Sequence, residues 1–297
     1  MAAPVPSVPP VLIGQLTDTH VLSDDETTDR DVDNNARLTL AVESMVSESP
    51  TLDAVLVTGD LTDTSHPHAF ETLVGALDAF LVPVLVLPGN HDTRAETRRA
   101  FPDMGWIDAD HLSWVHEIRG VRLIGLDSTR PRHHGAEFDG DRAEFLSSVL
   151  GERHDGPTIL AMHHPPFATG IDWMDRAGFI GLDRFADVLA AHPGTVDTIV
   201  CGHLHRPISS VVAGVPVQVG LAPVQHVALD LDADAGPAVI HDPIGYQIHL
   251  VAAPDRTVGA TTAHGVGRVV THTRYIGTGE TPFVPSWAAD HDPTAPF

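Results

Sequence analysis

The 297-residue chain is predicted to adopt an α/β fold that contains much parallel β-sheet. The first observation behind this prediction is that short apolar runs alternate with amphipathic segments over the first two-thirds of the chain. The second is that the sequence after about Arg206 changes to short β-rich runs split by Gly, Pro and Asp. We therefore expect a second β-sheet packed on the first, in a chain long enough to bury a sizeable core.

Six apolar runs in the first part have the length of buried strands. We predict strands at Val11–Leu16, Ala54–Thr58, Val82–Leu87, Arg122–Leu126, Thr158–Met162 and Thr195–Cys201. Four segments between them carry apolar residues at helical spacing. We predict helices at Asp33–Ser49, His68–Phe80, Gly140–Leu150 and Leu182–Ala191. This alternation is typical of βαβ units, whose strands are parallel.

The part of the chain after Arg206 is expected to form the second sheet. Its predicted strands are Val211–Ala213, Val215–Val219, His226–Leu231, Tyr246–Val251 and Arg268–Tyr275. Because no clear linker separates the two parts, we predict one domain over residues 1–276, with a motif-bearing part at 11–206 and a β-rich second-sheet part at 207–276. Residues 277–297 are rich in Pro, Thr and Asp and are expected to form an irregular arm or tail.

The charge of the chain is unusual for a folded protein. Acidic residues number 40 and basic residues 17, all of them arginine, so that the formal net charge is −23. Nucleic-acid polymers and anionic membranes bind basic surfaces, and neither is an expected partner. The first ten residues lack the basic residues of a targeting peptide, and no apolar stretch approaches the roughly 20 residues of a membrane helix. With Cys201 as the single cysteine, these features favour a cytoplasmic location.

Side chains of metal-binding types follow five of the predicted strands. These segments are Asp18-Thr19-His20, Gly59-Asp60, Gly89-Asn90-His91-Asp92, His163-His164-Pro165-Pro166 and Gly202-His203-Leu204-His205. Open α/β sheets place their ligand sites at the carboxyl ends of the strands. One His or Asp after a strand is usually a surface residue or a turn former. Five such segments at one sheet edge instead predict a metal centre, and the glycines are expected to let the backbone turn there.

The types of ligand narrow the choice of metal ion. Carboxylate, amide and imidazole groups without thiolate suit Mn, Fe or Zn better than Ca or a structural zinc site. A carboxylate such as Asp60 can bridge two ions, which a neutral histidine cannot do. Asp18 and His20 are separated by one residue, so that both can reach one metal from one loop. His203 and His205 have the same spacing and can each face a different metal.

The five segments, in this order, resemble the calcineurin-like metallophosphoesterase superfamily. Within it the chain is most similar to bacterial class III cyclic-nucleotide phosphodiesterases and to related glycerophosphodiesterases, over about residues 11–206. The resemblance implies a four-layer αββα sandwich of two mixed β-sheets flanked by helices. It also implies two metal ions per chain. The first would be held by Asp18, His20, Asp60 and His205, and the second by Asp60, Asn90, His163 and His203.

The activity implied by the resemblance is hydrolysis of a small phosphodiester, with 3′,5′-cyclic AMP as the leading candidate. A hydroxide that bridges the two ions would attack the phosphorus in line with the leaving oxygen. Asn90 and His91 would contact the substrate, and His91, oriented by Asp92 or Asp63, would act as general acid. The resemblance further implies a homodimer, for which the strands after Arg206 are the expected surface.

Several alternatives stay open at this point. A glycerophosphodiesterase or a phosphomonoesterase would carry the same metal motifs. An amidohydrolase would place an H-x-H segment after its first strand, where this chain has Asp18. A non-catalytic scaffold should lack some ligands, and none is missing. We expect His164 to be structural or to support the ligands, His133-His134 to lie in a loop, and Cys201 to be a buried strand residue.

Overall fold

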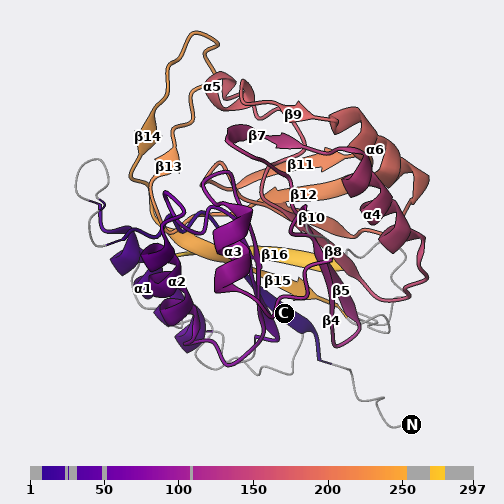
Figure 1. The fold of residues 1–297 in the computed structure, drawn as a ribbon, viewed down its shortest axis with the longest axis horizontal. Helices are drawn as coiled ribbons and strands as arrows, with labels where there is room; N and C mark the ends of the chain where they lie inside the picture. The colour runs from indigo at the N-terminus through magenta and orange to yellow at the C-terminus, as the bar shows by residue number, and fades with distance from the viewer. Residues whose placement is uncertain are drawn as a thin grey trace, which may run out of the picture.

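Two β-sheets lie face to face between two groups of helices in the computed structural model of the protein (Figure 1). The structure describes residues 9–23, 26, 32–48, 52–107, 110–252 and 268–277. The four layers agree with the expected αββα sandwich. The expected C-terminal arm, from residue 278 onward, lies outside the described residues.

The first sheet has the strand order β16-β15-β1-β2-β3. Its strands are β1 (Val11–Leu16), β2 (Ala54–Thr58), β3 (Val84–Leu87), β15 (Gly245–Val251) and β16 (Val269–Tyr275). The three early strands are parallel, and β15 and β16 extend the sheet in antiparallel pairing from the side of β1.

The second sheet has the order β11-β12-β10-β8-β5-β4. Its strands are β4 (Trp114–Ile118), β5 (Val121–Leu126), β8 (Thr158–Met162), β10 (Thr198–Cys201), β11 (Ile208–Val212) and β12 (Val215–Val219). The expectation that the strands after Arg206 form the second sheet by themselves is therefore wrong. Strands β11 and β12 join the second sheet through β10, β15 and β16 join the first sheet through β1, and the predicted strand at His226–Leu231 forms a separate two-stranded sheet.

The helices cover the outer faces of the two sheets. Helices α1 (Asn34–Glu48), α2 (Pro67–Leu77) and α3 (Arg94–Ala100) lie on one side, and α4 (Gly140–Gly151) and α6 (Leu182–Ala191) on the other (Figure 1). Short elements gather at one end of the sandwich. They are β6 (Thr129–Arg130), β7 (His133–Glu137), α5 (Asp172–Asp175), β9 (Phe179–Ile180), β13 (His226–Val227) and β14 (Val239–Ile240). No helix within the described ranges is long and apolar enough to span a bilayer.

The central strands are buried on both faces, which explains why their sequences read as continuous apolar runs. On β5, β8 and β10, alternate residues such as Leu123, Ile159 and Val200 pack toward the first sheet. Their neighbours, such as Leu160 and Ile199, pack toward α4 and α6. Because side chains alternate across a strand, each run contributes to two layers of core at once.

Two elements missed at the sequence level carried local signals. Helix α3 has few apolar residues, but Thr93 caps it by accepting a hydrogen bond from the backbone N–H of Glu96. The Thr-x-x-Glu pattern is a known start signal for helices. Strand β4 joins β5 through the two-residue turn Arg119-Gly120, in which both residues have positive φ. Such turns are typical of two-residue β-hairpins.

Trp114 joins the two sheets at their edge strands. Its fully buried indole faces Gly125 across the β4–β5 pair, and its Nε1–H donates a 2.7 Å hydrogen bond to the backbone oxygen of Val86 in β3. The indole occupies the space that a side chain at position 125 would need. Gly125 is thus required for close packing between layers.

We expect Gly125→Ala to destabilise the protein, because its Cβ would lie 2.2 Å from the Trp114 indole. Overpacked core substitutions typically lower the free energy of unfolding by about 1–3 kcal/mol. Urea unfolding followed by circular dichroism measures the change. Gly140→Ala, at the first position of α4, is the matched control, since nothing lies within 4 Å of its added Cβ. Equal stability of the two variants would contradict the packing described here.

Candidate metal centre

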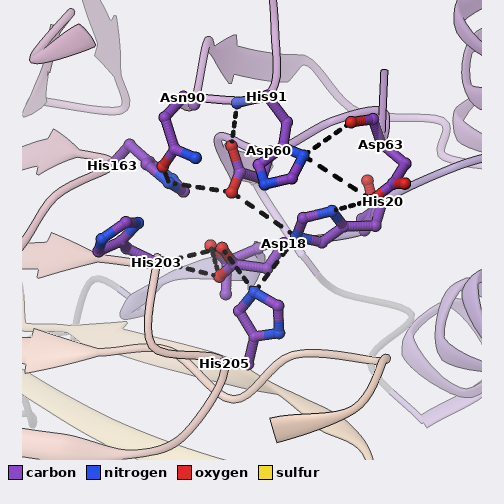
Figure 2. Close-up of polar contacts among 12 residues, drawn as sticks. Asp18, His20, Asp60, Asp63, Asn90, His91, His163, His203 and His205 are labelled. Carbon is purple, nitrogen blue, oxygen red and sulfur yellow. Dashed lines mark hydrogen bonds and ion pairs between the residues drawn. The ribbon is translucent and has the colours of Figure 1, made fainter. Parts of the chain in front are cut away.

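The structure brings all seven residues proposed as metal ligands to one end of the sandwich (Figure 2). They follow the carboxyl ends of β1, β2 and β3 in the first sheet and of β8 and β10 in the second. The site therefore spans the junction between the sheets. Backbone hydrogen bonds hold the loops together beyond the strands, for example from the N–H of His20 to Asp60 O and from the N–H of Gly202 to His163 O.

Five of the seven residues have a left-handed backbone. Their φ angles lie between 40° and 73°, and the residues are Asp18, His20, Asp60, His203 and His205. For residues with a side chain this conformation costs about 1–2 kcal/mol each. Strain of this kind persists where surrounding structure enforces it, and it gathers at functional sites. Five of the nine non-glycine residues with positive φ among the described residues are thus candidate ligands.

Glycines allow the ligand loops to approach one another. A Cβ on Gly202 would lie 2.0 Å from Thr17 Oγ1 and 2.7 Å from Asp18 Oδ2, and one on Gly89 would lie 2.1 Å from Asp60 Oδ1. At these two positions the small size of glycine is what matters. Only Gly59, with φ of +94°, needs the backbone freedom that the sequence analysis assigns to all three.

One group of candidate ligands comprises Asp18, His20, Asp60 and His205. One ligand atom from each lies within 4.8 Å of all the others. The Nε2 atom of His20 lies 3.6 Å from Asp60 Oδ2, and His205 Nε2 lies 3.6 Å from Asp18 Oδ1. The Asp18 carboxylate is itself held by the hydroxyl of Thr17 and by the backbone N–H of His203.

A second group lies on the other side of Asp60. His163 Nε2 lies 3.3 Å from Asp60 Oδ2 and 3.2 Å from Asn90 Oδ1. His203 faces His163, with ring centroids 5.2 Å apart. One carboxylate oxygen of Asp60 is therefore near both groups, which is the arrangement a bridging ligand requires.

The hydrogen bonds of three histidines determine which ring nitrogen faces the centre. The Nδ1–H groups of His20, His163 and His205 donate to Asp63 Oδ1, Thr58 O and Gln225 O, at 2.9, 2.9 and 2.6 Å. Each Nε2 of the neutral ring then carries a lone pair that points into the centre. The two Nε2 atoms of His20 and His205 lie 3.2 Å apart, a distance that allows a hydrogen bond when one of the two rings is protonated.

Converging lone pairs and carboxylates repel one another unless a cation or a proton lies between them. Metal-ligating histidines commonly donate their other N–H to a carbonyl or carboxylate in this way. The donor set fits divalent cations with nitrogen and oxygen ligands. These side chains could therefore hold metal.

The charge of Asp60 dominates the electrostatics of the second group. Burial by itself would lower the pKa of His163, but the charge of Asp60 and a hydrogen bond to it raise that pKa to about 9. Burial would raise the pKa of Asp60, and His163 lowers it well below its usual range. By contrast, burial lowers the pKa of His205 to about 4 and that of His203 well below its usual range. Burial would also lower the pKa of His20, but its hydrogen bond to Asp63 and the charges of Asp60 and Asp18 raise it. Asp60 thus favours a positive charge on the rings beside it, whereas His203 and His205 favour the neutral form of a ligand.

His91 lies beside the centre and differs from the ligands. Its backbone N–H donates to Asp60 Oδ1, and its Nδ1–H donates a 2.7 Å bond to the backbone oxygen of Asp63. The Asp63 carboxylate lies 3.8 Å from the same Nδ1. Of the two carboxylates expected to orient His91, Asp63 is therefore the one in contact.

Asp92 does not orient His91. Its buried carboxylate accepts from the backbone N–H groups of Gly89, Leu61 and Thr62, and it so joins the loops after β2 and β3. Burial and the charge of Asp60 raise the pKa of Asp92 to about 6. Asp92 therefore holds the backbone of these loops and does not hold the His91 ring.

A cavity of about 610 Å³ opens over the centre. His133 and His134 line it from β7, and Asn90 Nδ2 donates to His134 Nδ1 at 3.2 Å. The expectation that this pair lies in a loop is therefore wrong. Reasoning from the sequence also missed α5 and β14, which line the cavity with Trp173, Met174 and Val239.

His164 and Cys201 have the modest roles expected of them. The Nδ1 atom of His164 pairs with Ser128 Oγ and its Nε2 with His134 O, so that both ring nitrogens are engaged. Burial and the charge of His163 lower its pKa to about 3. Cys201 is fully buried in β10, and burial raises the pKa of its thiol, which disfavours a nucleophilic role.

The fold is shared with solved structures of low sequence identity. GAP50 of Plasmodium aligns with a TM-score of 0.60 at 12% identity, over 93% of this chain and 88% of that chain. A purple acid phosphatase from yellow lupin aligns with a TM-score of 0.56 at 13% identity, over 93% of this chain and 56% of that chain. At these identities the likeness concerns the fold alone.

Sequence relatives are more informative. A probable glycerophosphodiester phosphodiesterase of Arcobacter nitrofigilis is 30% identical over 275 residues, which cover 92% of this chain and 96% of the relative. A probable cyclic nucleotide phosphodiesterase of Rhodopseudomonas palustris is 33% identical over 249 residues, 82% and 89% of the two chains. The model of the calcineurin-like phosphoesterase family matches residues 11–207. With its ligand-type residues gathered at the sheet ends, the chain belongs to the calcineurin-like phosphoesterase family.

Proposed function

We propose that the chain is a two-metal phosphodiesterase that hydrolyses a small phosphodiester, with 3′,5′-cyclic AMP as the leading substrate. The observation that carries the proposal is the convergence of imidazole lone pairs and carboxylates on both sides of Asp60. In the proposed centre, Asp18, His20, Asp60 and His205 hold one ion, and Asp60, Asn90, His163 and His203 hold the other. Mn, Fe and Zn suit these ligands.

Bound divalent ions supply positive charge for the phosphoryl oxygens and lower the pKa of water in the site. The chain supplies the rest. Asn90 and His91 both line the cavity over the centre and would contact the phosphoryl group. The Nδ1–H bond to Asp63 O turns the Nε2 of His91 toward the cavity, and the Asp63 carboxylate lies 3.8 Å from the same Nδ1. Protonated His91 could then give its Nε2 proton to the departing alkoxide.

A glycerophosphodiesterase is the second candidate, and the extent of the match to the Arcobacter nitrofigilis relative favours it. The relative from Rhodopseudomonas palustris favours a cyclic nucleotide. An activity panel of cyclic nucleotides, glycerophosphodiesters and monoesters with Mn, Fe and Zn separates these candidates. Activity on p-nitrophenyl phosphate far above that on every diester would reject the diesterase. We also propose a cytoplasmic location, on the basis of the single cysteine.

Asp60→Ala should deplete both metal sites, because Asp60 Oδ2 lies close to ligands of both groups. His20→Ala should mainly deplete one site. Metal analysis of the purified variants by mass spectrometry measures the ion content per chain. Asp155→Ala, which removes an exposed carboxylate, is the matched control and should keep the wild-type content. Full two-ion occupancy in Asp60→Ala would remove Asp60 as the bridge.

His91→Ala should keep the metal and lose far more rate on a cyclic nucleotide than on bis(p-nitrophenyl) phosphate. An alkoxide is a poor leaving group unless it receives a proton, whereas nitrophenolate leaves with almost no help from an acid. Positioned acid catalysis is worth about 10²–10⁴-fold in rate. The ratio of kcat/KM for the two substrates measures the difference. His154→Ala, a histidine away from the cavity, should leave the ratio unchanged. Equal losses on both substrates would indicate that His91 acts only electrostatically.

We further propose a homodimer formed through the strands after Arg206. Strands β11 and β16 are edges of their sheets, and Val211, Val270 and Tyr275 expose apolar surface there. Such edges readily pair with another chain. Light scattering at micromolar concentration should give twice the chain mass of 31.7 kDa. The same measurement on Val211→Glu and on Val270→Glu tests whether a charge at either edge dissociates the dimer. A wild-type mass of one chain would refute the dimer.

A further inference from the structure

The cavity over the metal centre has two sides of different chemistry. The floor is polar and consists of candidate ligands with Asp63 and His91. The larger apolar side chains among the described lining residues come from two places, the α5 segment with Trp173 and Met174, and the β13–β14 hairpin with Val227 and Val239. A ligand that fills this space must therefore be polar at one end and apolar at the other.

A hydrogen bond ties the two apolar elements together. Arg176 Nη2 donates to the backbone oxygen of Ala233, in the connection between β13 and β14, at 3.2 Å. The guanidinium also pairs with Asp172 one turn earlier. Figure 1 shows α5 next to this connection, at the end of the sandwich. Arg176 thus joins α5 and the hairpin into one wall, which we define as Trp173, Met174, Val227 and Val239.

The indole of Trp173 gives this wall its specificity. Trp173 is the only Phe, Tyr or Trp among the described residues that line the cavity. A flat heterocycle gains about 1–3 kcal/mol by stacking on an aromatic face. A glycerol arm has no comparable surface, and a quaternary ammonium group is usually held by a cage of several aromatic rings. A single indole beside aliphatic side chains therefore suits a neutral, flat group.

We propose that the wall holds the nucleobase of the substrate and that Trp173 is a specificity-determining residue, selecting a nucleotide diester over a glycerophosphodiester. This inference rests on the proposed phosphodiesterase function. The phosphoryl group would lie toward the polar floor, and the base would stack on Trp173. The cavity of about 610 Å³ is within the size range of sites that enclose such ligands.

The test compares Trp173→Ala with the wild type on 3′,5′-cyclic AMP and on glycerophosphoethanolamine. The variant should lose about 5–150-fold more kcat/KM on the nucleotide than on the glycerol diester, which is the stacking energy expressed as a ratio. Trp173→Phe keeps an aromatic face and should retain most of the preference. Trp106→Ala, which removes an indole elsewhere in the chain, should change the ratio less than twofold. Equal losses on both diesters would overturn the role of the wall while leaving the phosphodiesterase intact.

Binding of adenosine tests the wall without any reaction. Adenosine lacks the phosphate, so calorimetry should detect weak binding to wild-type protein and loss of that binding in Trp173→Ala. Val239→Ser, at an exposed position of the hairpin, should weaken it without loss of folding. Unchanged adenosine affinity in both variants would refute the proposal. A Trp173→Ala loss of kcat/KM confined to glycerophosphoethanolamine would refute it as well. If wild-type protein cleaves no diester yet binds adenosine through Trp173, the proposed function fails and the wall stands.

Discussion

The arrangement of this protein depends on the carboxylates and imidazole nitrogens that the fold buries together around Asp60. Two imidazole nitrogens face each other at 3.2 Å, and a third lies 3.2–3.3 Å from two oxygens, one of the Asn90 amide and one of the Asp60 carboxylate. In a buried site such contacts are costly unless positive charge is present. The surrounding structure must therefore hold these groups close together, at backbone angles that are themselves unfavourable.

The two sheets provide that restraint. The five strands that carry the candidate ligands, β1, β2, β3, β8 and β10, end at the same edge of the sandwich. Hydrogen bonds between the loops that follow them continue the pairing beyond the strands. Asp92 joins two of these loops, and Gly89 and Gly202 let them approach more closely than any side chain would allow. Stability and function are thus linked, because the layers that bury the core also set the distances between ligands.

The acidic character of the chain makes the local charge of the centre important. A net charge of −23 repels phosphate esters at long range. Within the cavity, Asp60 and Asp63 add negative charge to the floor. Arg176 is the one arginine among the described lining residues, and its guanidinium donates a hydrogen bond to the Asp172 carboxylate. In the proposed function, bound cations reverse the sign at the floor, so that a phosphoryl group would be drawn there and the uncharged part of the substrate would be left to the apolar wall.

The sequence by itself determined the ligand-type residues and the α/β class, because both are local properties: apolar runs mark buried strands, and the chemistry of Asp18 or His163 is visible wherever the chain goes. The sheet that each late strand joins depends on pairing between distant segments. Strand β15 pairs with β1, which is far from it in the sequence, and not with the nearer strands β11 and β12. The same holds for the orienting carboxylate. Asp63 and Asp92 were equivalent in the sequence, and only packing put Asp63 beside His91. The wall at Trp173 was invisible for this reason too, because an apolar residue acquires a role in binding only when tertiary structure places it across a cavity from polar groups.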